Sequence, residues 1–390
     1  MRPGAGQPLR FVLLLGLVSL FADATYEGAR SITGPYLALL GAGAAAVGAV
    51  AGFGELVGYA LRLATGYLSD RTGRYWAIAI LGYAVNLAAV PLLALAGGWE
   101  VAALLIIAER TGKAIRTPAR DAMLSYVTRG MGHGRGFGLH EALDQVGAVA
   151  GPLLVAGALR WRGSYRLGFA LLLVPALAAL AVLLEARRLY PHPREFEPAS
   201  REVSAKGLPR AYWLYLGGVA LVAAGYADFA LIAYHLRRAA LTPEAWIPLL
   251  YAVAMGVDAP AALAFGRLYD RFGLRVLAGV SLLSAGFAPL IFLGGPRAAV
   301  AGIVLWGVGM GAQESVMRAA VAGMAPAERR GAAFGLFNAG YGFAWFLGSA
   351  LMGVLYGVSL SALAVFSAAL ELGSMAFFLA AKRKAPAAPA

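Results

Sequence analysis

The sequence contains no cysteine. This excludes disulfide bonds, thiolate metal sites and cysteine nucleophiles. Histidine is also rare, and the four residues present are too scattered for the ligand spacing of a zinc site: His133, His140, His192 and His235. The phosphate-binding pattern G-x-x-x-x-G-K-[ST] is missing as well, so direct use of ATP is not expected. From these absences we expect no metal and no cofactor.

Charged residues are few, at 14% of the chain against about 25% in soluble domains. Apolar residues make up 60%, and their runs repeatedly exceed the roughly 18 residues that mark a membrane-spanning helix. An ordinary soluble enzyme is therefore excluded. The net charge of +13 would suggest a nucleic-acid partner for a soluble protein. Here the basic residues are spread over short loops, so no nucleic acid is expected.

Apolar runs bounded by glycine, proline or charge predict an all-α integral membrane protein with twelve transmembrane helices. A polar stretch with four prolines near mid-chain predicts a cytoplasmic linker at 188–209, between six-helix bundles at 1–187 and 210–390. Basic residues gather in alternate loops, and the positive-inside rule then places both termini in the cytoplasm. We expect a multi-pass protein of the cytoplasmic (inner) membrane.

Two stretches of the sequence recur at a nearly constant offset. The residues 66–74 recur 200 positions later at 266–273, and Phe-Gly-Leu at 137–139 recurs 197 positions later at 334–336. Two parallel halves follow, which is a recurrent transporter architecture. A cleaved signal peptide that ends in the A-x-A pattern at 22–24 is the competing interpretation of the N-terminus. Its removal would leave one half a helix short.

The stretch Gly66-Tyr67-Leu68-Ser69-Asp70-Arg71-Thr72-Gly73-Arg74 resembles the signature G-x-[LY]-[SAG]-D-[RK]-x-G-[RK]-[RK] of the major facilitator superfamily. It departs from the pattern only at Tyr75, where a basic residue is usual. The resemblance covers the whole chain and implies two bundles that alternate access to a central site. It also implies a latch between the halves, formed by Gly66, Asp70, Arg71, Gly73 and Arg74, with Asp270 and Arg271 in the second copy.

The signature residues also have physical interpretations that do not depend on the resemblance. Gly66 is expected to let two helices approach closely. Arg71 and Arg74 are open to a second interpretation, in which they only set the orientation of the chain in the membrane.

A second motif, formed by Gly147, Gly151 and Pro152, resembles the superfamily's antiporter pattern G-x-x-x-G-P-x-x-G-G, although Val155 and Ala156 replace its last two glycines. The stretch 109–122 resembles a block of one branch of bacterial exporters. These resemblances favour export. Small residues four positions apart also allow tight helix packing, so a structural interpretation of the motif stays open.

Ionisable side chains inside membrane helices are costly, at about 2.5–3.5 kcal/mol each on insertion scales, so each should face a partner or a watery cavity. They concentrate in the first half of this chain. Helical spacing sorts them into stripes, which are Asp23, Glu27 and Arg30 on the first helix, Lys113, Arg116 and Arg120 on the fourth, and His140, Glu141 and Asp144 on the fifth. An acidic stripe facing a basic stripe is the natural arrangement.

This group of charges has two interpretations. In the functional one, a carboxylate carries a proton across the membrane, and the cations hold a substrate group. The proton candidates are Asp23, Glu27, Glu141 and Asp144, and the substrate candidates are Arg30, Lys113, Arg116 and Arg120. In the structural one, the same residues are permanent ion pairs that hold the helices together.

The second half has fewer ionisable residues within its predicted helices, namely Asp228, Asp258, Glu314 and Arg318. The stretch Tyr226-Ala227-Asp228 is a counterpart of Phe21-Ala22-Asp23 in the first helix. The substrate candidates here are Gln313, Glu314, Arg318, Asn338, Tyr341 and Trp345. Glu314 and Arg318 are four residues apart and could instead pair with each other. Aromatic packing between helices is the alternative for Trp345.

Together these features predict a transporter rather than an enzyme. We expect a proton-coupled antiporter of the drug and small-molecule efflux type that works by alternating access. Its partners would be the substrate, protons and membrane lipid, and it would function as a monomer. Uptake or facilitated transport of an organic anion, and export of a siderophore or metal, stay open. A membrane enzyme or scramblase with His140, Glu141 and Asp144 as acid and base is the non-transport alternative.

Overall fold

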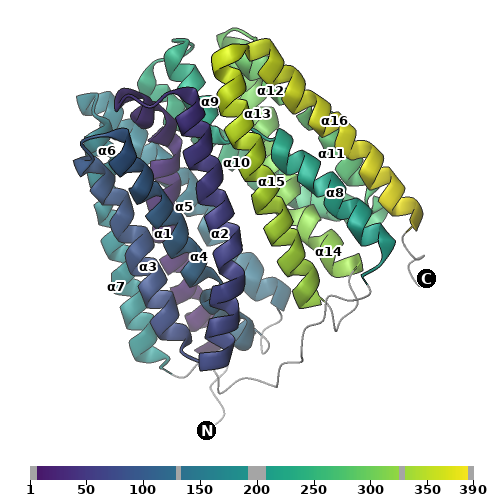
Figure 1. Ribbon diagram of the computed structural model, residues 1–390. Coiled ribbons are helices and arrows are strands. Elements are labelled where there is room, and N and C mark those ends of the chain that lie inside the picture. Colours follow the sequence, from purple (N-terminus) through teal and green to yellow (C-terminus); the bar gives the residue numbers. More distant parts are fainter. Residues whose placement is uncertain (1–6, 129–132, 192–207, 325–329, 385–390) are drawn as a thin grey trace. The chain divides into compact units, whose positions relative to one another are not determined.

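The structure is a computed structural model, which describes residues 7–128, 133–191, 208–324 and 330–384 (Figure 1). Within these ranges every regular element is a helix. The chain divides into two compact units. Unit 1 comprises Met1–Gly41, Val57–Ala199 and Glu244–Ala252, and unit 2 comprises Ala42–Leu56, Ser200–Pro243 and Val253–Ala390. Most of the predicted linker at 188–209 lies outside the described residues.

Six α-helices and a short 3-10 helix belong wholly to unit 1: α1 (Gln7–Leu39), α3 (Tyr75–Leu92), η1 (Leu93–Leu95), α4 (Trp99–Thr128), α5 (His133–Arg162), α6 (Tyr165–Leu171) and α7 (Leu173–Leu189). Two long helices are shared between the units. The second part of α2 (Ala44–Thr72) belongs to unit 1, as do η3 (Glu244–Trp246) and the start of α10 (Ile247–Phe272).

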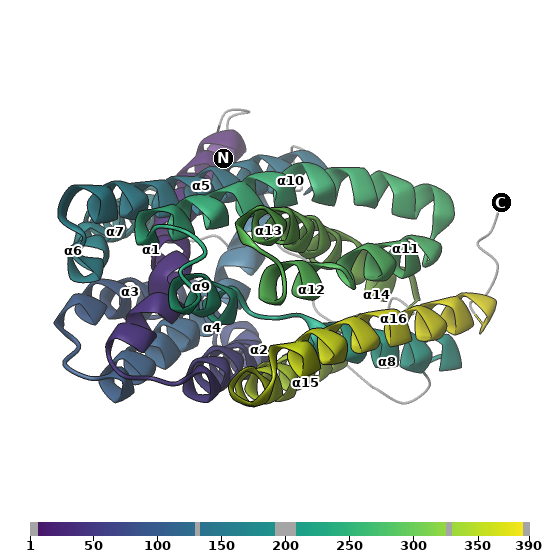
Figure 2. The same cartoon turned by 90° about the horizontal axis from the view of Figure 1, so that it is seen from above.

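The remaining helices belong to unit 2: α8 (Arg210–Gly225), α9 (Phe229–Arg238), α11 (Arg275–Ser284), α12 (Phe287–Phe292), α13 (Pro296–Ala312), the π-helical turn η4 (Gln313–Met317), α14 (Arg318–Met324), α15 (Arg330–Val358) and α16 (Leu360–Lys384). The helices α8 and α16 lie side by side in both views (Figures 1 and 2).

Eleven helical segments of the described chain are long and apolar enough to cross a membrane. The helix α4 is not among them, although its 30 residues give it sufficient length, because it carries many charged side chains. The predicted count of twelve therefore depends on α4. A helix with this charge can cross a bilayer only if neighbouring helices compensate its charges.

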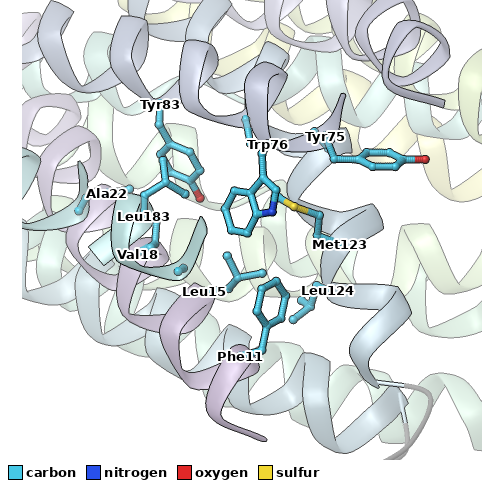
Figure 3. Close-up of a cluster of buried hydrophobic side chains, with 14 of the residues drawn as sticks. Phe11, Leu15, Val18, Ala22, Tyr75, Trp76, Tyr83, Met123, Leu124 and Leu183 are labelled. Carbon is cyan, nitrogen blue, oxygen red and sulfur yellow. The ribbon is translucent and has the colours of Figure 1, made fainter. Parts of the chain in front are cut away.

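An apolar core in unit 1 joins α1, α3, α4 and α7 (Figure 3). Trp76 lies near its middle, with the ring of Phe11 edge-on to it at 6.2 Å between centroids and Met123 beside it. The Trp76 indole donates a hydrogen bond to the Tyr190 carbonyl oxygen (2.9 Å), so its one polar atom is satisfied. By packing α1 and α4 together, this core brings their charged stripes into range of each other.

The internal repeat is visible in backbone conformation. Gly73 and Gly273, which are 200 positions apart, both adopt positive φ, at 66° and 60°. Each donates a hydrogen bond from its amide to a carbonyl four residues back, Ser69 in the first copy and Tyr269 in the second. Glycine is required here because side chains rarely tolerate this backbone conformation. The two copies of the signature therefore end their helices in the same way.

The repeat is also visible in helix packing. A Cβ added at Gly151 of α5 would lie 2.1 Å from the carbonyl oxygen of Ala24 in α1, and one added at Gly348 of α15 would lie 2.0 Å from the carbonyl oxygen of Ala224 in α8. These pairs differ by offsets of 200 and 197 positions, as the sequence repeat does. Each unit thus contains the same backbone contact between equivalent helices.

One pair of equivalent helices differs between the units. The helix α1 runs unbroken through Asp23, whereas its counterpart is interrupted between α8 and α9. Asp228 caps the start of α9, where its Oδ1 accepts a hydrogen bond from the Ala230 amide (2.9 Å). The packing contacts make Ala224 the counterpart of Ala24, so Asp228, at an offset of 205 positions, is not the structural counterpart of Asp23. The two carboxylates also have different surroundings.

The close approach of α1 and α5 predicts a specific loss of stability. Gly151→Ala would force the helices apart, and overpacking of this kind costs about 1–3 kcal/mol. We expect this variant to unfold at a lower temperature than the wild type in detergent. Gly157→Ala in the same helix is the matched control, since an added Cβ there meets nothing within 4 Å. Equal melting temperatures for both variants would contradict the packing argument.

Candidate functional site

Charged side chains of α1 and α4 face each other inside unit 1. Arg116 Nη2 lies 3.9 Å from Asp23 Oδ1, and Lys113 Nζ lies 3.9 Å from Glu27 Oε1. The two acids are four residues apart in α1 and the two bases three apart in α4, so each pair shares a helix face. The acidic and basic stripes meet as the sequence predicts. We call the group formed by these residues and their charged neighbours the acid–base cluster: Asp23, Glu27, Lys113, Arg116, Arg120, Asp121, His140 and Asp144.

Aromatic rings support the basic stripe. The Lys113 ammonium lies 3.7 Å from the centre of the Tyr26 ring, and the Arg116 guanidinium lies 4.5 Å from that of Tyr83. Arg116 Nη1 also donates a hydrogen bond to the Tyr83 hydroxyl (3.0 Å). Only 1% of the Arg116 side chain is exposed. Cation–π contacts of desolvated cations contribute about 2 kcal/mol, which helps to offset this burial.

A chain of polar contacts links α4, α1 and α5. Arg120 Nη1 donates to the Ser19 hydroxyl (3.1 Å), and Ser19 Oγ shares a hydrogen bond with His140 Nε2 (3.1 Å). The other ring nitrogen, Nδ1, lies 3.5 Å from Asp144 Oδ2. Because Ser19 accepts from Arg120, its own proton can go to Nε2, which leaves the His140 proton on Nδ1, toward Asp144. The protonation of Asp144 is thereby connected to the basic stripe.

Arg120 departs from the expected arrangement. Its guanidinium pairs with Asp121, the next residue in α4, at 2.9 Å from both Nε and Nη2 to Oδ1. Arg120 therefore does not form a third ion pair with α1, although its hydrogen bond to Ser19 connects it to that helix. Pairing with a neighbour on the same helix satisfies the guanidinium where α1 presents no carboxylate opposite it.

Glu27 has a second partner in unit 1. The Tyr251 hydroxyl, from the start of α10, donates a short hydrogen bond to Glu27 Oε2, while Lys113 lies near the other carboxylate oxygen. Both oxygens of Glu27 are thus engaged, one by a neutral donor and one by a cation. Any group that displaces Tyr251 or Lys113 must replace these contacts, since an unpaired buried carboxylate is costly.

Close packing of α3 and α4 holds the basic stripe in place. A Cβ added at Gly112 would lie 2.3 Å from the Asn86 amide nitrogen, and one added at Gly82 would lie 2.5 Å from that of Arg116. The Asn86 side chain donates to Glu109 Oε1 (2.8 Å), and Glu109 also pairs with Arg110 (3.4 Å). The glycine of the exporter-like stretch at 109–122 is therefore a packing residue.

Two further candidates of unit 1 are Glu141 and Arg30. Glu141 is exposed on α5, whereas the other predicted proton carriers are buried (Asp23 and Glu27) or partly buried (Asp144). Arg30 is partly buried one turn beyond Glu27 in α1.

Gly147 and Gly151 of the antiporter-like motif face the α1 backbone, and Pro152 lies inside α5. The motif thus has a packing role, as its structural interpretation predicts.

The candidates in unit 2 surround the π-helical turn η4. Gln313 and Glu314 begin this turn, and Arg318 follows it. The Tyr341 hydroxyl donates to Gln313 Oε1 (2.9 Å), and Glu314 and Arg318 are exposed. Turns of this kind occur frequently at functional sites.

Of the α15 candidates, Asn338 is partly buried and Trp345 is 2% exposed, between the rings of Tyr341 and Tyr226 at 5.4 and 6.1 Å. Trp345 therefore packs among aromatic rings, as the alternative interpretation of the sequence has it.

The signature residues lie at the ends of α2 and α10. Arg71, Arg74, Asp270 and Arg271 are exposed, and the side chain of Asp70 lies outside the described part of the structure. The expectation of close packing at Gly66 is wrong, because an added Cβ would make only ordinary contacts with Pro118, the nearest at 3.5 Å. The signature position where the structure requires a glycine is instead Gly73, whose backbone has a positive φ.

Sequence reasoning missed several residues that contact the charges. Tyr26 could have been predicted, because it lies three residues after Asp23 and therefore on the same face of the first helix. Tyr83 lies in the helix that precedes Arg116 in the sequence. Nothing in the sequence connects Tyr251 with Glu27, which are more than 200 positions apart. Among the described residues, no group of three His, Asp or Glu side chains is placed to hold a metal ion.

A family model described as the Major Facilitator Superfamily matches residues 15–296 and 242–390. An uncharacterized protein of Mycobacterium bovis is 43% identical over 390 residues, covering 97% of this chain and 95% of the relative. An uncharacterized MFS-type transporter of Methanocaldococcus jannaschii is 26% identical over 370 residues, which is 89% of each chain. The solved structure of the peptide transporter POT in complex with sulfate has the same fold, with a TM-score of 0.78 at 16% identity over 98% of this chain and 95% of that one.

The burial of Arg116 generates a prediction about stability. Arg116→Met leaves the Asp23 charge without its cation, and breaking a buried pair costs about 3–5 kcal/mol. We expect a loss of this size in the free energy of unfolding, measured by denaturant titration in detergent. The double variant Asp23→Asn with Arg116→Met removes both charges and should recover part of the loss.

An exposed pair supplies the control for this experiment. Arg188 and Glu185 also lie 3.9 Å apart, but 83% and 50% of their side chains are exposed. Arg188→Met should therefore change the free energy of unfolding by less than about 1 kcal/mol. If the double variant in the cluster is as unstable as the sum of its two single variants, the Asp23–Arg116 interaction is not coupled in this way.

Proposed function

This chain belongs to the Major Facilitator Superfamily and is a multi-pass membrane transporter, and we propose that it is an antiporter that exports a small molecule in exchange for protons. The observation that carries the proposal is the charge balance of the acid–base cluster. The cluster contains four carboxylates and three Lys or Arg cations. One carboxylate is left over when each cation is paired.

The carboxylate left over is Asp144. Lys113, Arg116 and Arg120 pair with Glu27, Asp23 and Asp121 respectively. Within the described structure, the ion-pair neighbour of Asp144 is His140, which is buried, and its Oδ1 has no hydrogen-bond partner. A proton on Asp144 would bring the cluster to electrical balance. Asp144 is therefore the proton carrier that we propose among the four candidates.

The polar chain through Ser19 connects this proton to the substrate-binding residues. When Asp144 loses its proton, its negative charge attracts the His140 proton and Arg120, which lies within electrostatic range. A substrate with a cationic group would neutralise the same charge. Proton and substrate then compete for one carboxylate, and competition of this kind produces exchange. A proton that enters the cell down its gradient would drive the substrate outward.

Other features support export through the cytoplasmic membrane. The signature and the antiporter-like motif favour it by resemblance, and the repeated helix contacts Gly151–Ala24 and Gly348–Ala224 are suited to two bundles that move as bodies. We propose α4 as the twelfth transmembrane helix, because α1 and α3 supply partners for its charges. Both termini would then be cytoplasmic. The acid–base cluster is formed within one chain, which is consistent with a functional monomer.

Transport of an organic anion is the second candidate, and one observation favours it. Lys113 is the most exposed cation of the basic stripe, with 21% of its side chain exposed, and its contact with Glu27 is long, at 3.9 Å. An anionic substrate group could take the place of Glu27 beside Lys113. The peptide transporter POT, whose structure resembles this one, was solved with sulfate, which is an anion.

The Asp144 assignment predicts that transport can be uncoupled from protons. We propose to reconstitute the wild type and Asp144→Asn into liposomes with an acidic lumen and to follow a panel of candidate substrates, such as organic cations, a dipeptide and a nucleoside. An antiporter accumulates its substrate in the acidic lumen. Asp144→Asn should lose this accumulation by at least tenfold and retain substrate exchange at equal pH, because its side chain cannot carry the proton.

Glu141→Gln is the matched control, because Glu141 is exposed on the same helix three residues earlier. It should behave as the wild type. If Asp144→Asn still accumulates substrate, the proton is carried elsewhere. If the wild type shows exchange that ignores the pH gradient, the protein is a uniporter.

The choice between a cationic and an anionic substrate depends on Lys113. Lys113→Gln keeps the length of the polar side chain approximately but removes the cation. A cationic substrate should still be transported, since Asp144 is intact, whereas an anionic one should lose most of its affinity. The measurement is the concentration for half-maximal exchange in the same liposomes. A large loss of affinity would favour the anion over the substrate that we propose.

A further inference from the structure

A buried carboxylate of unit 2 has no part in the acid–base cluster. Glu371 lies in α16 and is 0% exposed. Neither of its carboxylate oxygens has a hydrogen-bond partner among the described residues, and no charged side chain of the described structure compensates it. Sequence reasoning missed this residue. The signal available was a single acid in the apolar run of α16, flanked by serines four residues before and three after.

Close packing between α16 and α8 encloses Glu371. Ser367, Glu371 and Ser374 share one face of α16, and each is 0% exposed. The Ser367 hydroxyl donates to the Gly225 carbonyl oxygen at the end of α8 (2.6 Å). An added Cβ at Gly225 would lie 3.0 Å from Leu370 Cβ, so the two helices leave no space between them at this level.

Hydroxyl groups surround the site, and the structure shows what they bind. Ser374 Oγ lies 2.8 Å from Ser281 Oγ of α11 and 2.7 Å from the Glu371 carbonyl oxygen. The Tyr226 hydroxyl donates to the Trp306 carbonyl oxygen. These hydroxyls join α16 to its neighbours through backbone and serine oxygens. They do not bind the Glu371 carboxylate.

Few titratable groups lie on the helices that pack against α16. Tyr226, after α8, lies within electrostatic range of Glu371. The helix α12 has none, and α11 has Arg275 at its exposed first position. The remaining tyrosines and arginines within α8 and α15 are engaged elsewhere or lie at the helix starts: Arg210, Tyr212, Tyr215, Arg330, Tyr341 and Tyr356.

These surroundings are suited to a neutral acid and not to a charge. An ionised carboxylate without partners in a dry interior is far more costly than the neutral acid. We propose that Glu371 is a proton-binding site of unit 2, which holds its proton while α16 is packed against α8 and α11. Release of the proton requires these helices to separate enough to admit water. The packing of α16 is then sensitive to pH, independently of the substrate.

Infrared spectroscopy tests the protonation directly. An exposed glutamate is ionised at about pH 7, so the C=O stretching band of a protonated carboxylic acid at that pH identifies a buried one. We expect the full-length protein in liposomes to show this band and Glu371→Gln to lose a component of it. Asp144→Asn identifies any component due to Asp144. A band that Glu371→Gln leaves unchanged would overturn the proposal, whatever the outcome for antiport.

Thermal stability gives a second readout that needs no substrate. As the pH rises from about 6 to 9, the wild type should lose stability relative to Glu371→Gln, because only the wild type has this acid to ionise. Glu314→Gln, which removes an exposed acid of the same unit, should follow the wild type. A constant difference between wild type and Glu371→Gln would contradict the proposal.

If Glu371→Gln fails to fold, Glu371→Met and the pH dependence of the wild-type infrared band provide the same test. Replacing choline chloride by sodium chloride tests for a bound cation. If sodium restores stability at high pH in the wild type but not in Glu371→Gln, the ligand is a metal cation, and the assignment of a proton is wrong.

Discussion

The ion pair between Asp23 and Arg116 is the interaction on which the interior of unit 1 depends. A guanidinium that is 1% exposed must have its charge compensated by neighbouring side chains. The Asp23 carboxylate, the Tyr83 hydroxyl and two tyrosine rings do this. Each of these partners comes from α1 or α3, so the charge determines which helices lie beside α4. A helix with the composition of α4 could not otherwise be placed in an apolar environment.

The two units share the same helix-packing contacts but contain different side chains in their interiors. Both bring equivalent helices into backbone contact at a glycine, and both end their second helix with a glycine at positive φ. Among the described residues, the interior of unit 1 is rich in paired charges, whereas that of unit 2 contains aromatic rings, hydroxyls and a few buried acids, including Glu371, whose carboxylate has no hydrogen-bond partner. In unit 1 a proton would change the balance of existing ion pairs. In unit 2 it would decide whether a dry interface stays closed.

Local patterns predicted a large part of the site. The spacing of Asp23 and Glu27, and that of Lys113 and Arg116, was sufficient to predict two stripes, because residues three or four apart share a helix face. The high cost of a charge in lipid then made pairing the natural arrangement. The same reasoning failed for Arg120, which pairs with Asp121 beside it. It also failed for Gly66, where a motif glycine was taken as a packing residue and ordinary contact distances show that it is not.

The sequence by itself determined that this is an all-helical membrane protein with an internal repeat and charges concentrated in its first half, because hydropathy, offset and helical period are properties of the chain alone. Only the tertiary structure decided which carboxylate lacks a cation, that Tyr251 reaches Glu27, and that Glu371 is enclosed without partners. The physical reason is that helical period specifies the face on which a side chain lies. What lies opposite that face depends on contacts between segments that can be more than 200 residues apart.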